Sequence, residues 1–100
     1  MEISDYSKNY RETPRNAEEV KALISRVNRV KGQIDGVKTM LEENRYCGDI
    51  LIQLSAAESA LRSLSYLIFE EHLATCVADK LKRDDPDIIG ETVELVKRLK

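Results

Sequence analysis

The chain has 100 residues, of which 34% are charged, and its formal net charge is −2. This length supports one domain, and only four Gly and two Pro argue against a turn-rich all-β fold. The reactive inventory is one His and two Cys, which excludes much of the usual enzyme chemistry, and the slightly acidic total gives no sign of a nucleic-acid binder.

Residues 1–16 are polar, mixed in charge and without a sustained period, so we predict a flexible N-terminal arm followed by one helical domain over residues 17–100. The arm lacks the apolar core of a secretory signal. No segment approaches the roughly 20 apolar residues that a membrane span needs. We therefore expect a cytoplasmic protein without a membrane partner, in which both cysteines are reduced thiols.

The first predicted helix follows the arm, with Asn16 placed to cap it. Apolar residues recur along it in alternating steps of three and four, which is a heptad seam. These residues are Val20, Leu23, Val27, Val30, Ile34, Val37 and Leu41. Gly32 and Gly36 each cost about 1 kcal/mol in a helix interior relative to Ala. Because they lie four residues apart on one face, we interpret them as a site of close helix packing.

A second seam predicts a helix from about Cys47 to about Leu81. Its apolar positions are Ile50, Leu54, Ala57, Leu61, Leu64 and Ile68. A third, shorter helix fits residues 87–99, with Pro86 suited to its first turn. One side of this helix carries Ile89, Val93, Val96 and Leu99, and an alternative side carries Ile88, Thr92 and Leu95. The sequence thus predicts an all-α fold, an antiparallel helical hairpin plus a short C-terminal helix.

The second helix is apolar on more than one side, because Leu51, Ile52, Leu67 and Phe69 lie off its seam. A helix that is apolar nearly all round must be buried nearly all round. One partner helix and one short helix cannot provide that cover. We therefore predict an obligate oligomer in which the hairpins complete each other's core.

His72 and Cys76 are four residues apart, so they lie one turn apart on one face of the second helix. Taken alone, this spacing more often means a half-buried His beside a small core thiol. Cys47 lies 25 residues before His72, roughly 37 Å along an unbroken helix, so the three cannot share a metal within one chain. Antiparallel pairing of two second helices about a two-fold axis would bring Cys47 of each chain to His72 and Cys76 of the other.

Two thiolates and one imidazole form a soft ligand set that favours Cu(I). Structural zinc sites almost always have four protein ligands, and the chain's only His and both Cys are already used. A Glu or Asp could supply a fourth ligand, so zinc is disfavoured and stays an open alternative.

Three separated segments resemble the copper-sensitive operon repressor (CsoR) family. Residues 26–36 (RVNRVKGQIDG) are similar to its R-x-x-R-x-x-G-Q-x-x-G signature. Residues 45–56 (RYCGDILIQLSA) are similar to its R-Y-C-x-D-I-L-x-Q-[IL]-S-A block, and residues 71–76 (EHLATC) contain its H-x-x-x-C block. The resemblance covers about residues 18–100.

The resemblance implies a dimeric four-helix bundle stacked into a flat tetramer, and a repressor that binds operator DNA without metal and releases it with Cu(I). It assigns Cys47, His72 and Cys76 as Cu(I) ligands, with Tyr46 and Glu91 hydrogen-bonded around the His. Glu94 is the other candidate for that acid. The family's nickel and cobalt sensors carry an N-terminal His and its persulfide sensors lack the ligand His, so the Cys–His–Cys set indicates the copper branch.

Charge is unevenly distributed, since residues 20–38 carry a net +4 and residues 39–79 a net −5. By itself, the basic first helix is most simply a solvated face. With the resemblance, its residues become predicted phosphate contacts, which should make DNA binding sensitive to salt. The predicted DNA-binding residues are Lys21, Arg26, Arg29, Lys31 and Arg62.

Three alternatives of other kinds remain at this point. In a thiol- or persulfide-responsive repressor of the same family, His72 would have no role in the response. A copper-buffering protein would bind copper without DNA, which leaves the basic helix unexplained. A cysteine enzyme would need an oxyanion site that a helical bundle does not offer, so we expect neither an enzyme nor a small-molecule substrate.

Overall fold

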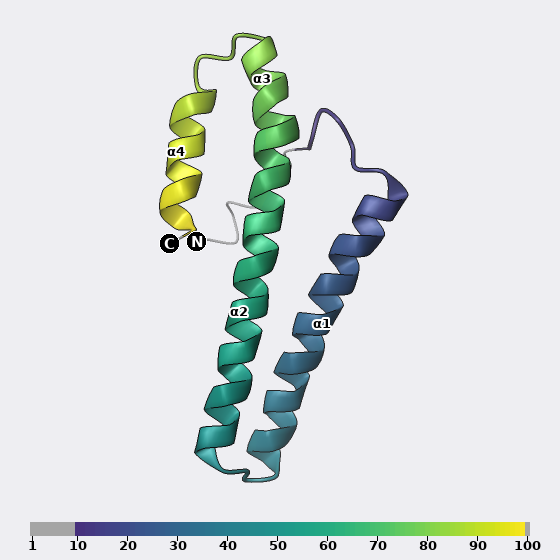
Figure 1. Ribbon diagram of the computed structural model, residues 1–100, viewed down its shortest axis with the longest axis vertical. Coiled ribbons are helices and arrows are strands. Elements are labelled where there is room, and N and C mark those ends of the chain that lie inside the picture. Colours follow the sequence, from purple (N-terminus) through teal and green to yellow (C-terminus); the bar gives the residue numbers. More distant parts are fainter. Residues whose placement is uncertain (1–9, 100) are drawn as a thin grey trace. The chain divides into compact units, whose positions relative to one another are not determined.

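The computed structural model describes residues 10–99, and every regular element in that range is helical. The elements are α1 (Ala17–Glu42), α2 (Cys47–Glu71), the π-helix η2 (His72–Val77), α3 (Ala78–Lys82) and α4 (Ile88–Arg98) (Figure 1). This confirms the predicted all-α class. In the described range no helix is long and apolar enough to cross a membrane.

Contacts divide the chain into two compact units. The hairpin unit spans Arg15–Glu70, and the terminal unit spans Glu71–Lys100 together with the N-terminal segment up to Pro14. The first nine residues of the predicted flexible arm lie outside the described residues.

The hairpin unit consists of α1 and α2, which run antiparallel (Figure 1). Asn16 caps α1 as predicted, because its side chain accepts from the Glu19 backbone at 2.8 Å while the Glu19 carboxylate accepts from the Asn16 backbone at 3.1 Å. After α1 the chain reverses at Asn44, whose φ of 54° lies in the left-handed region. The Tyr46 carbonyl then accepts the backbone N–H of Asp49 at 3.1 Å, in the first turn of α2.

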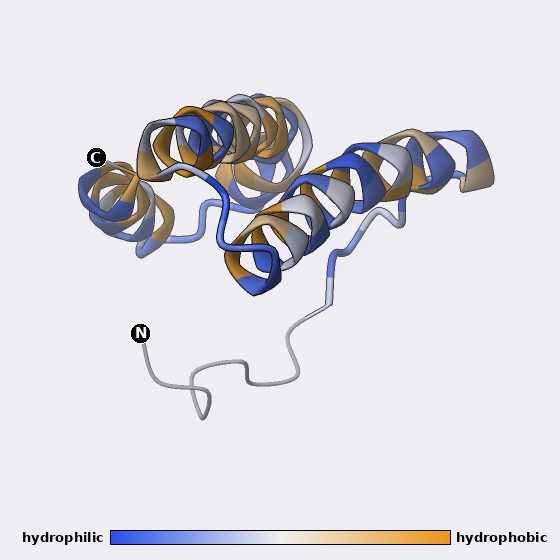
Figure 2. Cartoon of the chain, turned by 90° about the horizontal axis from the view of Figure 1, so that it is seen from below, coloured by the Kyte–Doolittle hydropathy of each residue, from blue (hydrophilic) through white to orange (hydrophobic). Residues whose placement is uncertain are grey.

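The core of the hairpin unit is thin. Only five apolar side chains are buried, and they follow the predicted seams with a spacing of seven residues on each helix: Val30, Val37, Ile50, Ala57 and Leu64. The off-seam residues Leu51 and Ile52 are 64% and 70% exposed. Apolar positions recur turn after turn along the helices (Figure 2), so much apolar surface is left for association.

Gly32 and Gly36 are not packed against a neighbour in the described part of the chain. A Cβ built on either residue would meet no other group within 4 Å. The close helix contact predicted at these glycines is therefore absent within the described residues of one chain. The two glycines leave a strip without side chains on α1.

The terminal unit departs from the predicted pattern at one point. The helical segment that starts at Cys47 reaches Lys82, close to the predicted end, but six residues of it, His72–Val77, are π-helical. The chain then turns at Asp84, whose φ is 55°. The Asp85 carboxylate accepts the Asp87 backbone N–H at 2.9 Å, just before α4 begins at Ile88.

α4 buries the alternative side of the two that the sequence allowed. Ile88 is fully buried, and Thr92 and Leu95 are half-buried. Ile89 and Val93 are 61% and 49% exposed, so the first of the two faces is not the covered one. Pro86 lies two residues before the helix rather than in its first turn.

Candidate metal centre

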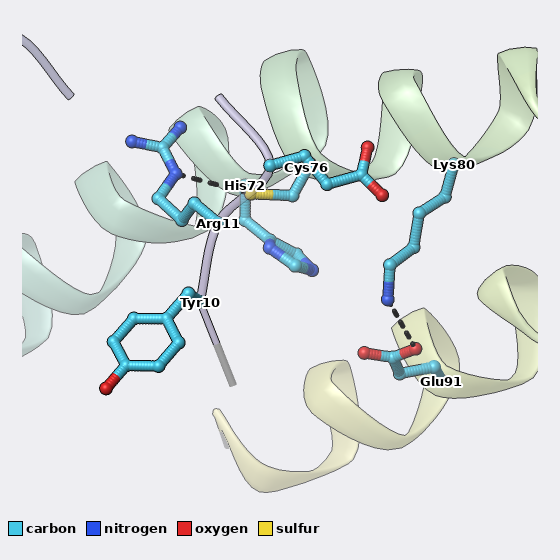
Figure 3. A pocket seen from close by; sticks show the side chains of 7 residues that line it. Tyr10, Arg11, His72, Cys76, Lys80 and Glu91 are labelled. Carbon is cyan, nitrogen blue, oxygen red and sulfur yellow. Dashed lines mark hydrogen bonds and ion pairs between the residues drawn. The ribbon is translucent and has the colours of Figure 1, made fainter. Parts of the chain in front are cut away.

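His72 and Cys76 line one cavity of ≈ 200 Å³ in the terminal unit, with both side chains supplied by η2 (Figure 3). The other lining residues are Tyr10, Arg11, Glu12, Lys80 and Glu91. Short π-helical segments often occur at functional sites. Here the segment holds the two predicted ligands, at its first and fifth positions.

The His72 ring is in an unusual state for a half-buried imidazole. Its Nε2 atom is buried and has no hydrogen-bond partner among the described residues. An unpaired buried nitrogen costs free energy, on the order of 1–3 kcal/mol. This nitrogen is therefore suited to receive a ligand, either a metal ion or a hydrogen-bond acceptor that moves to it.

Cys76 is half-buried and reduced. Its Sγ accepts a hydrogen bond from Arg11 Nε at 3.4 Å (Figure 3). A cysteine binds a metal ion through its sulfur as the thiolate, and this sulfur lines the same cavity as His72.

Glu91 lies in the first turn of α4, where the helix dipole favours an acidic side chain. It lines the cavity with His72, and its Oε2 pairs with Lys80 Nζ at 3.5 Å (Figure 3). Glu94 instead pairs with Lys97 at 3.4 Å and does not line this cavity. Of the two candidate acids, Glu91 is thus the one near His72.

Cys47 and Tyr46 lie in the other unit. Cys47 is exposed at the first position of α2, and Tyr46 is 76% exposed. The Tyr46 ring lies over Gly48, where an added Cβ would come within 2.5 Å of the ring. Position 48 therefore has to be glycine for this ring placement.

Among residues 10–99 no three His, Cys, Asp or Glu side chains are grouped so that one chain could hold a metal ion with them. The structure brings two of the predicted ligands together, His72 and Cys76. It does not place a third ligand of these types in their cavity with metal-binding geometry.

The predicted DNA-binding residues do not form one cluster. Arg26 and Arg29 line a shared hollow on α1 with Ala22 and Ser25. Lys31 instead lines the apolar groove that α1 forms with α2. Arg62 pairs with Glu58 at 3.2 Å, which partly neutralises it. Lys21 lies near the start of α1.

Four residues of the cavity were missed from the sequence, namely Tyr10, Arg11, Glu12 and Lys80. Lys80 could have been found, because residues 72, 76 and 80 are four apart and share one helical face. Arg11 carried no signal, since it lies 65 residues from Cys76 in sequence.

The residues present fit a soft ion. One imidazole nitrogen without a partner among residues 10–99 and one thiol that accepts from a cation line a single cavity. Nitrogen and sulfur donors of this kind suit Cu(I) or Zn(II) better than Mg(II) or Ca(II), which take oxygen ligands.

Comparison with known proteins places the chain among metal-responsive regulators. Residues 19–98 match a family described as metal-sensitive transcriptional repressor. The copper-sensing transcriptional repressor CsoR of Bacillus subtilis is 34% identical over 84% of each chain. The copper-sensing transcriptional repressor RicR of Mycobacterium tuberculosis is 42% identical over 69% of this chain and 72% of its own length.

Two solved structures share the fold. The Cu(I)-bound copper-sensing repressor CsoR of Geobacillus thermodenitrificans superimposes with a TM-score of 0.84 at 35% identity, over 91% of this chain and 96% of its own. The nickel-responsive transcriptional regulator InrS gives a TM-score of 0.69 at 29% identity, over 91% of this chain and 100% of its own.

The fold is that of a metal-responsive transcriptional regulator. The chain belongs to the family of metal-sensitive transcriptional repressors. It is accordingly a regulator and not an enzyme, and membership implies DNA binding and oligomerisation.

Proposed function

We propose that this protein is a copper(I)-responsive transcriptional repressor, which binds operator DNA in the metal-free state and releases it when Cu(I) binds. The observation that carries the proposal is that His72, whose Nε2 has no partner among the described residues, and the Cys76 thiol line one cavity. Copper-sensing relatives, one of them with Cu(I) bound, share the fold over most of the chain.

The choice of metal rests on donors rather than on fold, because a nickel-responsive regulator has a similar fold. His72 is the only His in the chain. The available soft set is therefore one imidazole and two thiolates, which suits Cu(I).

The third ligand in this proposal is Cys47 of the partner subunit. Cys47 is exposed at the start of α2, and the exposed apolar side chains of α2 require cover by a second copy. Antiparallel pairing of two hairpins provides that cover and gives two equal sites per dimer. A homotetramer would follow from stacking two such dimers.

In this proposal, Glu91 links Cu(I) binding to DNA binding, because it can pair either with Lys80 or with His72. Bound at this site, Cu(I) supplies a common centre for the three donors. His72 would use one ring nitrogen as ligand and would offer the other to Glu91, with Tyr46 as a further hydrogen-bonding residue for the His. In this proposal Glu91 exchanges Lys80 for His72, and since Glu91 belongs to α4, this exchange would move α4 relative to η2.

DNA binding in this proposal centres on α1. Arg26 and Arg29 share an exposed hollow, and Lys21 lies on the same helix. Lys31 and Arg62 are secondary DNA contacts in this proposal. Lys31 lines the apolar groove between α1 and α2, and Arg62 is paired with Glu58. Phosphate contacts should dominate the affinity.

An anaerobic Cu(I) titration with DNA binding read out in parallel tests the proposal. The DNA is a duplex selected from a random pool by the metal-free protein. We expect one equivalent of Cu(I) per chain and release of the duplex over the same range. Stoichiometric copper binding by a protein that selects no duplex would instead indicate a copper buffer. Release by a persulfide donor, with no response to Cu(I), would indicate a thiol sensor.

A further inference from the structure

One wall of the cavity that holds Cys76 is supplied by the N-terminal segment. Tyr10, Arg11 and Glu12 line this cavity, and Arg11 Nε donates to Cys76 Sγ at 3.4 Å (Figure 3). The other lining residues come from η2, α3 and α4. We call residues 10–13 the strap. The strap lies against the thiol, although no part of the proposed copper response requires it.

Two further contacts fasten the strap beside Cys76. Thr13 Oγ1 donates to Asp79 Oδ2 at 2.9 Å, and Glu12 pairs with Arg83. Asp79 lies three residues after Cys76, and Arg83 lies four residues after Asp79, so the three contacted residues follow one side of the helical stretch. The strap is thus held along this side at three successive points.

The contacts that fasten the strap are individually weak. Residues 10–13 have no regular secondary structure. The hydrogen bond of Thr13 is exposed, and the side chains of Glu12 and Arg83 are 41% and 59% exposed. Exposed ion pairs contribute little to stability, and segments with few buried contacts open locally before the helices do. The strap can therefore leave the cavity while η2 and α3 stay folded.

We propose that the strap controls access to the Cys76 thiol by size. In the closed position it lies over the sulfur, so a bulky molecule reaches the thiol only after the contacts with Asp79 and Arg83 release. A single metal ion is much smaller than the cavity of ≈ 200 Å³ and does not need this opening. The strap thereby shields a sensing thiol from large thiol-reactive molecules. The inference goes beyond the proposed function, because it concerns the metal-free protein and holds for any effector.

Alkylation of the metal-free, full-length protein gives the first test. The small N-methylmaleimide and the large N-(1-pyrenyl)maleimide are both neutral and react by the same chemistry, so the ratio of their rates cancels the thiolate fraction. Peptide mass spectrometry measures this ratio at Cys76 and, as an internal reference, at the exposed Cys47. Thr13→Val and Glu12→Gln each remove one fastening contact.

We expect each variant to raise the large-to-small ratio at Cys76 by about threefold, the scale of one exposed contact. The ratio at Cys47 should not change. Two matched controls lie away from the cavity: Thr39→Val removes a hydroxyl that donates to the Asp35 carbonyl, and Glu94→Gln weakens the pair with Lys97. Neither control should change the ratio at Cys76. An unchanged ratio at Cys76 in both strap variants overturns the inference, and so does an equal rise at Cys47, which would indicate general loosening.

A charge exchange at the ion pair gives the second test. Glu12→Arg and Arg83→Glu each place like charges opposite one another, which should open the strap and raise the large-to-small ratio at Cys76 by more than about threefold. The double variant restores the pair in reverse, so its ratio should return to within about twofold of wild type. A double variant that stays as reactive as the single variants contradicts the fastening of the strap to Arg83. Neither test uses Cu(I) or DNA, so its outcome is independent of the copper proposal.

Discussion

The two units of this chain differ in how much apolar surface they expose and in how their polar side chains are paired. The hairpin unit has two long helices, a thin seam of buried residues and much exposed apolar surface, such as Ile52 at 70%. The terminal unit has shorter elements and a cavity in which Lys80 pairs with Glu91 and Arg11 with Cys76, while the Nε2 of His72 has no partner among the described residues. The hairpin unit is suited to association with other molecules, and the terminal unit is suited to detecting one ligand.

The predicted ligands cross this division. Cys47 belongs to the hairpin unit, while His72 and Cys76 belong to the terminal unit. In the proposed function, a metal held by all three would therefore couple the hairpin unit of one chain to the terminal unit of another. Each prediction below tests whether that separation of roles holds.

The largest effect is expected from the cysteines. Cys47→Ser and Cys76→Ser should each lower Cu(I) affinity by more than about 100-fold, because each removes a proposed direct ligand of the metal. Loss of a residue that only hydrogen-bonds to a ligand typically lowers metal affinity by roughly 10–100-fold, and loss of a ligand should cost at least as much. Mixing the two variants should restore tight binding, since a mixed dimer has one intact site and one site lacking both thiols. Anaerobic competition titrations measure this. If the mixture binds no better than the single variants, the site does not combine the two chains.

The next effect concerns His72, which links metal binding to DNA binding in the proposed function. His72→Ala should keep Cu(I) binding through the two thiolates but lose the release of DNA, a coupling that is typically 5–150-fold in affinity. DNA titrations with and without Cu(I) give the coupling. A variant that still releases DNA on copper addition would show that His72 is not the link between the units.

Arg29→Ala on α1 should weaken DNA binding by about tenfold and reduce the slope of log affinity against log salt by about 0.9, the value for one phosphate contact. Its Cu(I) affinity should stay at the wild-type level, because Arg29 is not a proposed ligand and does not line the cavity of His72 and Cys76. Arg98→Ala serves as the control of equal charge. A change in Cu(I) affinity comparable to the change in DNA affinity would break the separation of roles.

A smaller effect is expected from Lys80→Met. Removing the ammonium frees Glu91 to accept from His72 before any metal arrives, so the metal-free protein should bind DNA about threefold more weakly. An exposed or partly exposed ion pair is worth roughly 0–1 kcal/mol, which limits the shift. Lys97→Met, which breaks the Glu94 pair, is the matched control. Equal DNA affinity in Lys80→Met and wild type would remove Lys80 from the coupling.

Gly32→Ala should give the smallest change. The added methyl group meets open space in the chain, so the better helix propensity of Ala should raise the free energy of unfolding by about 1 kcal/mol. Urea unfolding at fixed protein concentration measures it. A loss of stability, with a change in oligomeric state, would instead show that another copy packs against this strip.

Much of the hairpin unit could be predicted because periodicity reports directly on which face is buried. The heptad positions Val30, Val37, Ile50, Ala57 and Leu64 are the buried ones. The buried face of α4 could not be predicted from the sequence, since both of its faces are apolar. In the structure the buried face is that of Ile88, the first residue of the helix. The π-helical segment was missed because a few residues of i→i+5 bonding leave no periodic signal.

The candidate site was predicted in part. The spacing of four placed His72 and Cys76 together, and the structure favours Glu91 over Glu94 because only Glu91 lines their cavity. Arg11 was beyond prediction, because its contact with Cys76 depends on how Glu12 and Thr13 are fastened, not on a local pattern. The ligand role of Cys47 is still a prediction.

The exposed apolar side chains of the hairpin unit also make protein concentration a variable of the response. Leu51 and Ile52 are largely exposed in the described part of the chain, and if association covers them, the assembled form gains stability as the chain becomes more abundant. If ligands come from two copies, a cell with few copies binds less Cu(I) at the same free concentration of the ion. The amount of this protein would then set the threshold of the response, alongside the affinity of the site.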